Sequence, residues 1–247
     1  MSICCGIFIC VVLAAANEDA TATQPDCTEQ SAEAKASLTD KSKPVLTFDR
    51  NSVPAPDPTK GAPLARVFNE YVYLTELKAE SAELTREQSE QLSGRIFTPL
   101  LQRFLKEHRL CATDEEILQF QTAMQFEPLS AEEREGLTPD EQREFEESMR
   151  KMAEMMVVGW KRDRALYERY GGIVIFQQGN PFEPVGAYRQ FLEETEKAGV
   201  FEVFQADHRQ TFWSYFVSSH RQFQIPAEDV NFSQPWWMLK PADESPM

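Results

Sequence analysis

The chain has 247 residues, of which 40 are acidic and 25 are basic, so its formal net charge is −15. This length allows one large domain or two small ones with a sizeable core. The acidic balance argues against nucleic acid and anionic lipid as partners. Helix-forming residues dominate and glycine is scarce, which predicts a mainly α fold.

The first sixteen residues are almost wholly apolar and uncharged. Residues 6–16 have the length of the apolar region of a secretory signal peptide and are too short to span a bilayer. Ala14-Ala15-Ala16 then offers small residues for cleavage, although no Lys or Arg precedes the apolar region. We expect residues 1–16 to be a signal peptide, which places the mature protein in the periplasm without membrane insertion.

Cleavage would leave two cysteines, Cys27 and Cys111. In an oxidising compartment two cysteines favour one disulfide, which would tie the N-terminal segment to the helical body. The alternative is two unpaired thiols, because the sequence does not show whether their Cα atoms come close enough. We predict the disulfide.

We expect residues 17–62 to be a flexible leader and linker, followed by a single helical domain over residues 63–247. Up to residue 40 the leader is rich in Ala, Thr, Glu and Ser and has no sustained apolar period. Residues 54–63 are rich in proline. Between these stretches, residues 45–48 could form a short strand.

The first predicted helix begins at Pro63 and runs to about Glu83, with apolar residues at helical spacings. Later helix starts share one pattern, a Ser or Thr followed three residues later by Gln or Glu, which is the capping box. The apolar faces of the two helices that follow include Phe104 and Phe120. The four capping pairs are Thr85 and Gln88, Thr113 and Glu116, Ser130 and Glu133, and Thr138 and Glu141.

The longest predicted helix lies between Thr138 and Gly172. Thr138 is a suitable N-cap and Pro139 suits the first helical position. Gly171-Gly172 can take the positive φ that ends a helix. Apolar residues recur between these ends at spacings of three and four, which predicts a stripe along one side. We expect the other segments to pack around this helix.

Four of the eight methionines lie in this long helix, close to Trp160. Methionine adapts to irregular partners, so one interpretation is a soft apolar groove that binds polypeptides. The other interpretation is an ordinary helix core filled by methionine. The groove interpretation predicts a binding site made of Met149, Met152, Met156, Trp160, Phe104 and Phe120.

After the long helix, residues 173–176 form a short β-branched run, which is the best strand candidate in the chain. It could pair with residues 45–48. The expected fold is therefore a multi-helix array around one long helix, with at most one short β pair. The remaining predicted elements are helices at about 183–197 and 207–219 and a tail that contains Trp236 and Trp237.

The chain has three histidines, His108, His208 and His220, whose spacing does not match a metal site. We interpret them as surface or capping residues. The sequence contains no motif of the serine hydrolases, zinc proteases or nucleotide-binding proteins. Cys111 near His108 has no third group to orient the imidazole. We therefore predict no catalytic site, no metal and no cofactor.

From Leu92 the sequence reads LSGRIFTPLLQRFLKEHRLCATDEEI. This stretch resembles the N-terminal helical region of SurA-type periplasmic folding factors, where an amphipathic helix precedes a short turn and a capped helix. The resemblance covers about residues 64–176 and implies a chaperone-like module that cradles extended, aromatic-rich polypeptides. The matching apolar positions are Ile96, Leu100, Leu101 and Leu105, and the turn and helix start are Thr113 to Ile117.

No segment resembles the parvulin prolyl-isomerase domain of that family, so the resemblance does not imply isomerase activity. Residues 170–194 are similar to stretches of uncharacterised exported bacterial proteins. The helical domain is accordingly divided into a SurA-like core, residues 63–176, and a C-terminal helical extension, residues 177–247.

Three functional hypotheses follow. In the first, the chain is a non-enzymatic, periplasmic, chaperone-like protein that binds non-native or partner polypeptides in the apolar groove. In the second, it is a structural or assembly subunit of an exported complex that docks through its Trp236-Trp237 tail. In the third, it is an enzyme whose site is assembled from scattered carboxylates and histidines.

Overall fold

The computed structural model describes residues 40–79, 81, 83–126 and 130–239. The predicted signal peptide, the predicted leader before residue 40 and Cys27 lie outside the described residues. Within this part of the chain, none of the helices combines the length and the apolar character that a membrane span requires.

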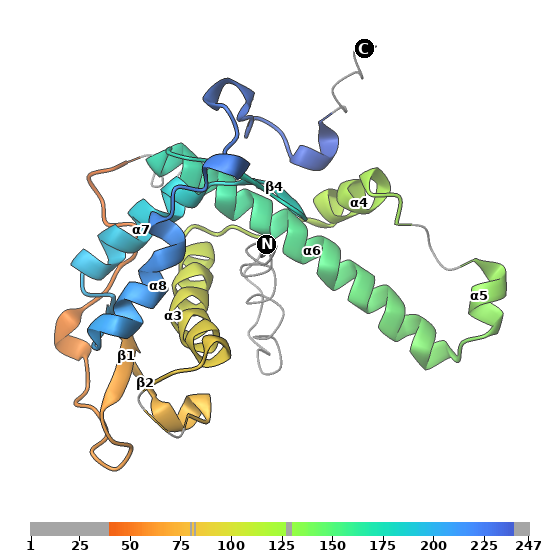
Figure 1. Cartoon of the computed structure of the whole chain (residues 1–247). Helices are drawn as coiled ribbons and strands as arrows, with labels where there is room; N and C mark the ends of the chain where they lie inside the picture. The colour runs from red at the N-terminus through yellow and green to blue at the C-terminus, as the bar shows by residue number, and fades with distance from the viewer. Residues whose placement is uncertain (1–39, 80, 82, 127–129, 240–247) are drawn as a thin grey trace.

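A three-stranded antiparallel sheet lies at one end of the body of the molecule (Figure 1). Its central strand pairs with both neighbours, so that Arg66 lies opposite Tyr71 in one and opposite Glu202 in the other. In spatial order the strands are β2 (Glu70–Tyr73), β1 (Pro63–Val67) and β5 (Phe201–Val203).

Helices cover this sheet and build the main hydrophobic core with it, because three short strands are not stable alone. Leu64 of β1 and Phe104 and Phe191 of the helices are fully buried in this core. The helices that pack on the sheet and on one another are α3 (Arg86–Glu107), α7 (Val185–Lys197) and α8 (Ala206–Val217).

The predicted helix from Pro63 to about Glu83 is wrong, and so is the expectation of at most one short β pair. This stretch forms β1, β2 and the 3-10 helix η2 (Leu74–Leu77). Phe68 has a φ of 51° at the turn between the strands. The spacing of apolar residues also fits two short strands, and aromatic and β-branched residues favour strands. Those residues are Val67, Phe68, Tyr71, Val72 and Tyr73.

A separate antiparallel hairpin is formed by β3 (Ile175–Gln177) and β4 (Asn180–Glu183). The predicted strand at residues 173–176 is thus confirmed in part, whereas its pairing with residues 45–48 is wrong. Val45 is buried without forming a strand. Its N–H donates to Glu194 Oε1 at 2.8 Å, and its carbonyl lies 3.0 Å from His108 Nε2.

The long helix is confirmed as α6 (Pro139–Tyr170). Its capping box is complete, since Glu141 N–H donates to Thr138 Oγ1 at 3.3 Å and Thr138 N–H donates to Glu141 Oε2 at 2.7 Å. At the other end Gly171 takes a φ of 65°. The residues that begin and end this helix are therefore the local capping residues and the glycine that the sequence predicts.

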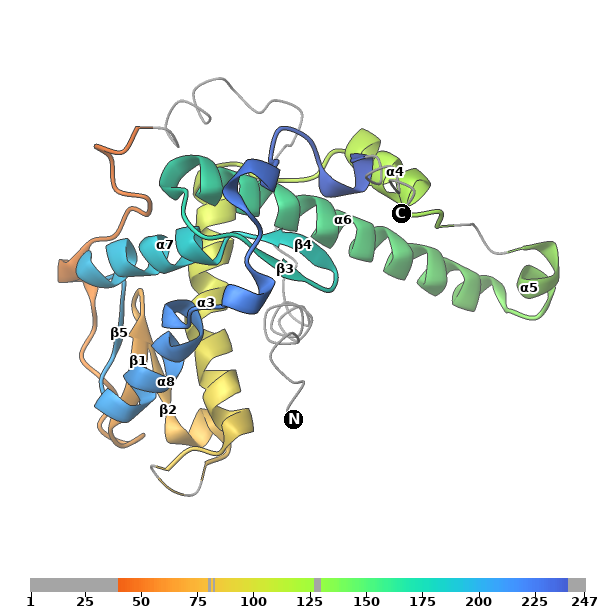
Figure 2. The same ribbon diagram turned by 45° about the horizontal axis from the view of Figure 1, so that its top comes forward.

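Smaller elements complete the chain. The capping pairs of α3 and α4 (Asp114–Ala123) are also present as predicted, and α5 (Ala131–Glu135) begins directly after Ser130, the first residue of the third predicted capping pair. Figures 1 and 2 show the N-terminal half of α6 extending away from the body, with α4 beside its middle and α5 near its outer end. The remaining 3-10 helices are η1 (Arg50–Ser52), η3 (Arg221–Phe223), η4 (Ala227–Asp229) and η5 (Trp236–Met238).

Candidate functional site

The N-terminal part of α6 stands clear of the body (Figure 2). None of its residues from Pro139 to Met152 is buried, whereas buried side chains begin at Ala153. Packing in a core therefore does not hold this half of the helix. Its support comes from the N-cap, from side-chain pairs within the arm such as Arg143 with Asp140 at 2.9 Å, and from the ion pair of Arg150 with Asp114 in the first turn of α4 at 2.5 Å. We call residues 139–152 the arm.

An apolar stripe runs along the arm toward the body. It consists of four residues spaced by four, three and four positions, so they share one side of the helix. Phe145 is 39% exposed and Met152 is 37% exposed, so the outer part of the stripe is open to solvent. We call the four residues the Met stripe: Phe145, Met149, Met152 and Met156.

The inner end of the Met stripe joins a second hydrophobic cluster, separate from the main core. Met156 packs against this cluster, which forms where α4 meets α6. The ring of Trp237 lies 5.0 Å from that of Phe120 and 5.8 Å from that of Trp160. The buried residues of the cluster are Ile117, Phe120, Ala153 and Val157.

Residues 226–239 lie over this inner end, and we call them the C-terminal strap. Phe232 is buried and stacks on Tyr167 with ring centroids 4.7 Å apart. Farther along, Trp236 and Trp237 pack against the second cluster. The tryptophans that one hypothesis assigns to docking on another protein are therefore packed on helices of the same chain.

Five of the six residues predicted to bind polypeptide lie along one continuous surface. Met149 and Met152 are on the exposed arm, Met156 is at the junction, and Phe120 and Trp160 are beneath the strap. α4 and α6 are far apart in the sequence but pack against each other, which brings Phe120 close to the residues of α6.

Phe104 does not belong to this surface. It lies in the main core, with its ring 5.6 Å from that of Phe191 and 4.6 Å from that of His108. Helical periodicity shows that a side chain faces inward but does not show which of two cores it enters. The contact of Trp237 with the cluster is not predicted either, and the adjacent tryptophans are its only sequence signal.

Lys161 ties α4 to α6 where the arm leaves the body. Its ammonium group donates to Glu116 Oε2 at 2.6 Å and to the carbonyl of Cys111 at 2.7 Å. Cys111 is disulfide-bonded, and its predicted partner Cys27 lies outside the described residues. The first turn of α4 and the residues before it are thus fixed against α6.

Arg162 and Asp163 form an ion pair at 2.9 Å beside this tie, and their side chains are 5% and 2% exposed. The hydroxyl group of Tyr188 in α7 donates to Asp163, and the amide of Asn180 in β4 donates to it at 2.8 Å. Buried charges are costly unless they are paired and hydrogen-bonded. This network therefore fixes α7 and β4 on α6.

Glu183, at the end of β4, is a second buried carboxyl group near the network. Tyr215 donates its hydroxyl hydrogen to Glu183 Oε1 at 2.9 Å. Burial raises the pKa of Glu183 to about 8, with the charge of Asp163 adding to the rise and the hydrogen bond from Tyr215 opposing it. Both carboxyl groups are 2% exposed, so a substrate has no access to them in this structure.

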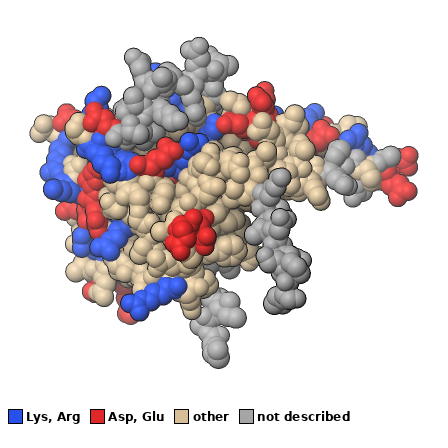
Figure 3. All heavy atoms as spheres, turned by 90° about the horizontal axis from the view of Figure 1, so that it is seen from above, with Lys and Arg blue, Asp and Glu red and all other residues tan. Residues whose placement is uncertain are grey.

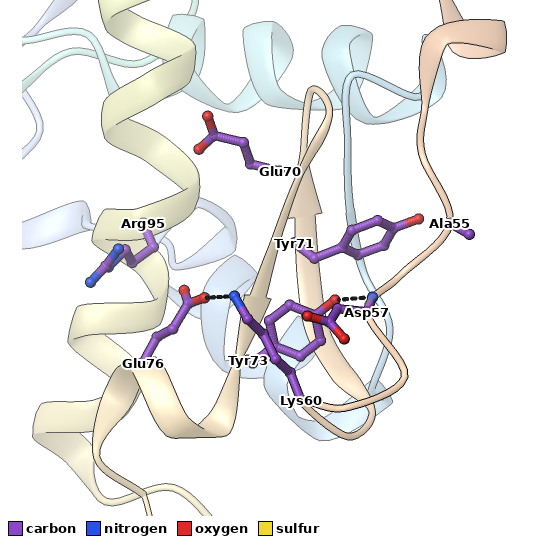
Figure 4. A pocket seen from close by; sticks show the side chains of 8 residues that line it. All are labelled: Ala55, Asp57, Lys60, Glu70, Tyr71, Tyr73, Glu76 and Arg95. Carbon is purple, nitrogen blue, oxygen red and sulfur yellow. Dashed lines mark hydrogen bonds and ion pairs between the residues drawn. The ribbon is translucent and has the colours of Figure 1, made fainter.

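A shallow pocket lies beside β2 (Figure 4). Lys60 and Glu76 form an ion pair at 3.9 Å on its wall, and the N–H of Asp57 donates to the hydroxyl group of Tyr73 at 2.7 Å. This lining contains no serine, threonine, cysteine or histidine. Among the described residues no group of His, Cys, Asp and Glu is arranged to hold a metal ion.

Charged side chains border the Met stripe and cover the opposite side of the arm. Along residues 139–152 five acids and three bases are all exposed. The view from above shows acidic side chains at the end of the molecule where α5 and the outer end of α6 lie (Figure 3). Such a border keeps an apolar stripe soluble and disfavours acidic partners. The acids are Asp140, Glu141, Glu144, Glu146 and Glu147, and the bases are Arg143, Arg150 and Lys151.

Comparison of the chain with protein-family models, curated proteins and solved structures finds no match.

Proposed function

We propose that this chain is a periplasmic protein that binds non-native or partner polypeptides along the Met stripe and catalyses no reaction. The observation that carries the proposal is the open outer part of the stripe, where Phe145 and Met152 are more than a third exposed on the arm, the part of α6 that has no buried residues. A helix segment whose apolar side is left open by the described residues gains free energy when a partner covers that side.

The chemistry of the stripe supports a broad choice of partner. Methionine has three rotatable bonds and a polarisable sulfur, so it fits side chains of different shapes. The affinity would come from apolar burial, and the acidic border would favour neutral or basic segments. Little hydrogen-bonding specificity is built into the arm.

The order of elements also supports the proposal. An amphipathic helix, a turn, a capped helix, a long helix and a short strand follow one another in α3, α4, α6 and β3, with α5 between α4 and α6. This order is the one on which the resemblance to SurA-type folding factors depends. The β1–β2 hairpin before α3 departs from it.

An aggregation assay tests the proposal. A urea-unfolded outer-membrane protein is diluted into buffer, and light scattering is followed with the wild type and with two double variants. M149S/M152S removes apolar area from the stripe. E147S/K151S is the matched control, because it also introduces two serines, but on the opposite side of the same turns. It leaves the net charge unchanged.

We expect the wild type and the control to suppress aggregation at several-fold molar excess. M149S/M152S should need about ten times more protein for the same effect, because less apolar area is buried with the client. Equal activity of both variants would place the binding elsewhere. No suppression by the wild type would contradict the proposal itself.

A further inference from the structure

The C-terminal strap is held to the rest of the chain in an unusual way. The last described backbone hydrogen bond that joins this end of the chain to another element runs from the N–H of Ile225 to the carbonyl of Val174 at 2.9 Å. Beyond it, the described backbone hydrogen bonds stay inside the strap, from Asp229 to Pro226, from Met238 to Pro235 and from Leu239 to Trp236.

Aromatic contacts take the place of backbone pairing. Phe232 stacks on Tyr167 and lies 6.0 Å from the ring of Phe182. Trp236 and Trp237 lie 6.3 Å and 5.0 Å from the ring of Phe120. An extended segment attached by a few aromatic side chains can leave its place without unfolding a helix or a strand.

The surface beneath the strap has the character of a binding site. It continues the Met stripe through Met156 and Val157 to Trp160. Trp160 is 9% exposed, and its indole N–H has no acceptor among the described residues. A buried donor without a partner is unfavourable, and a carbonyl group of an incoming polypeptide would satisfy it.

We propose that the strap occupies the inner half of the polypeptide-binding site and competes with the client for it. This inference rests on the function proposed above and adds regulation to the same site. With the strap in place, a client reaches only the arm. When Trp236 and Trp237 leave, the client also covers Met156, Val157 and Trp160.

Competition of this kind weakens binding, because the apparent association constant is the intrinsic one multiplied by the fraction of molecules whose site is free. Because the strap is part of the same chain, its effective concentration at the site is high, on the order of millimolar for a short connection. A client therefore binds tightly only if it displaces two tryptophans. Apolar segments that bind too weakly to displace them reach only the arm.

The test measures binding of fluorescently labelled, reduced and carboxymethylated α-lactalbumin, a permanently unfolded chain. The wild type is compared with W236A/W237A, and M238A is the matched control because Met238 lies on the strap and is 48% exposed. Hydrogen exchange of residues 232–239 is measured in the wild type with and without saturating probe. The second measurement needs no substitution, so it is independent of any folding defect.

We expect W236A/W237A to bind the probe roughly tenfold more tightly than the wild type, and M238A to bind like the wild type. Saturating probe should speed exchange in the strap of the wild type. If W236A/W237A binds with equal or lower affinity and strap exchange is unchanged, the competition is refuted while the proposed function stands. If neither protein binds the probe, the proposed function fails, and the competition fails with it.

Discussion

Glu183 is the residue whose ionisation should be visible in the stability of the whole protein. Its folded pKa of about 8 lies above its ordinary value of 4.5 because it is buried. Between these two pH values the unfolded chain releases the proton and the folded chain keeps it. The free energy of unfolding therefore contains a contribution that is complete below about pH 4.5 and is lost as the pH rises to about 8.

Replacing this residue, as Glu183→Gln, should remove that contribution. Relative to the wild type, the variant should gain stability as the pH rises from 4.5 to 8, by up to about 1.4 kcal/mol per pH unit, and the difference should then level off. Urea unfolding at several pH values measures it. Burial lowers the pKa of His108, whose effect is the same in both proteins and cancels in the difference. A difference that does not change with pH would contradict the buried, protonated state of Glu183.

The charged residues of α6 show where prediction from sequence stops at the residue scale. Charged residues such as Lys161, Arg162 and Asp163 usually lie on a solvated face. Instead, all three are buried. Their partners, among them Glu116 and Tyr188, come from other parts of the chain, and no local pattern predicts such pairs.

At the scale of elements, capping boxes of the same composition should differ in their effect on stability. The box of α4 begins a helix that packs on α6, whereas the box of α6 begins the arm. Thr113→Ala should lower the free energy of unfolding of the whole protein by about 1 kcal/mol. Thr138→Ala should leave it almost unchanged and should speed hydrogen exchange in the first turns of the arm.

Thermal unfolding together with hydrogen-exchange mass spectrometry measures both effects. Each variant is the control for the other, because both remove a threonine hydroxyl group from the same motif. A fall in melting temperature for Thr138→Ala as large as that for Thr113→Ala would show that the arm is packed on the body.

Helices whose ends are marked by capping residues were predicted well. Strands that depend on pairing with distant parts of the chain were not. Capping boxes mark the starts of α3, α4 and α6, and a glycine ends α6, so these helices are confirmed. The strands β1 and β2 lack such marks, and apolar spacing alone did not separate a hairpin from a helix. Strand β5 has three residues and depends on β1 for its pairing, so it was missed.

At the scale of the molecule, the candidate site is an apolar surface whose residues were largely predicted, whereas the segments that cover its inner end were not. The Met stripe follows from helical spacing within α6, which is a local property. The burial of its inner end depends on α4 and on the strap, which come from residues 114–123 and 226–239. The sequence identified the tryptophans of the strap but did not show that they pack on this surface.

Site-specific photo-crosslinking tests the central claim most directly. A photoreactive phenylalanine analogue is placed in turn at Met149 and Met152 on the stripe, and at Glu147 and Lys151 on the opposite side of the arm. The permanently unfolded probe is added before irradiation. The account predicts crosslinks to the probe from Met149 and Met152 and few or none from the other two positions. Equal crosslinking from both sides of the arm, or none from the stripe, would contradict it.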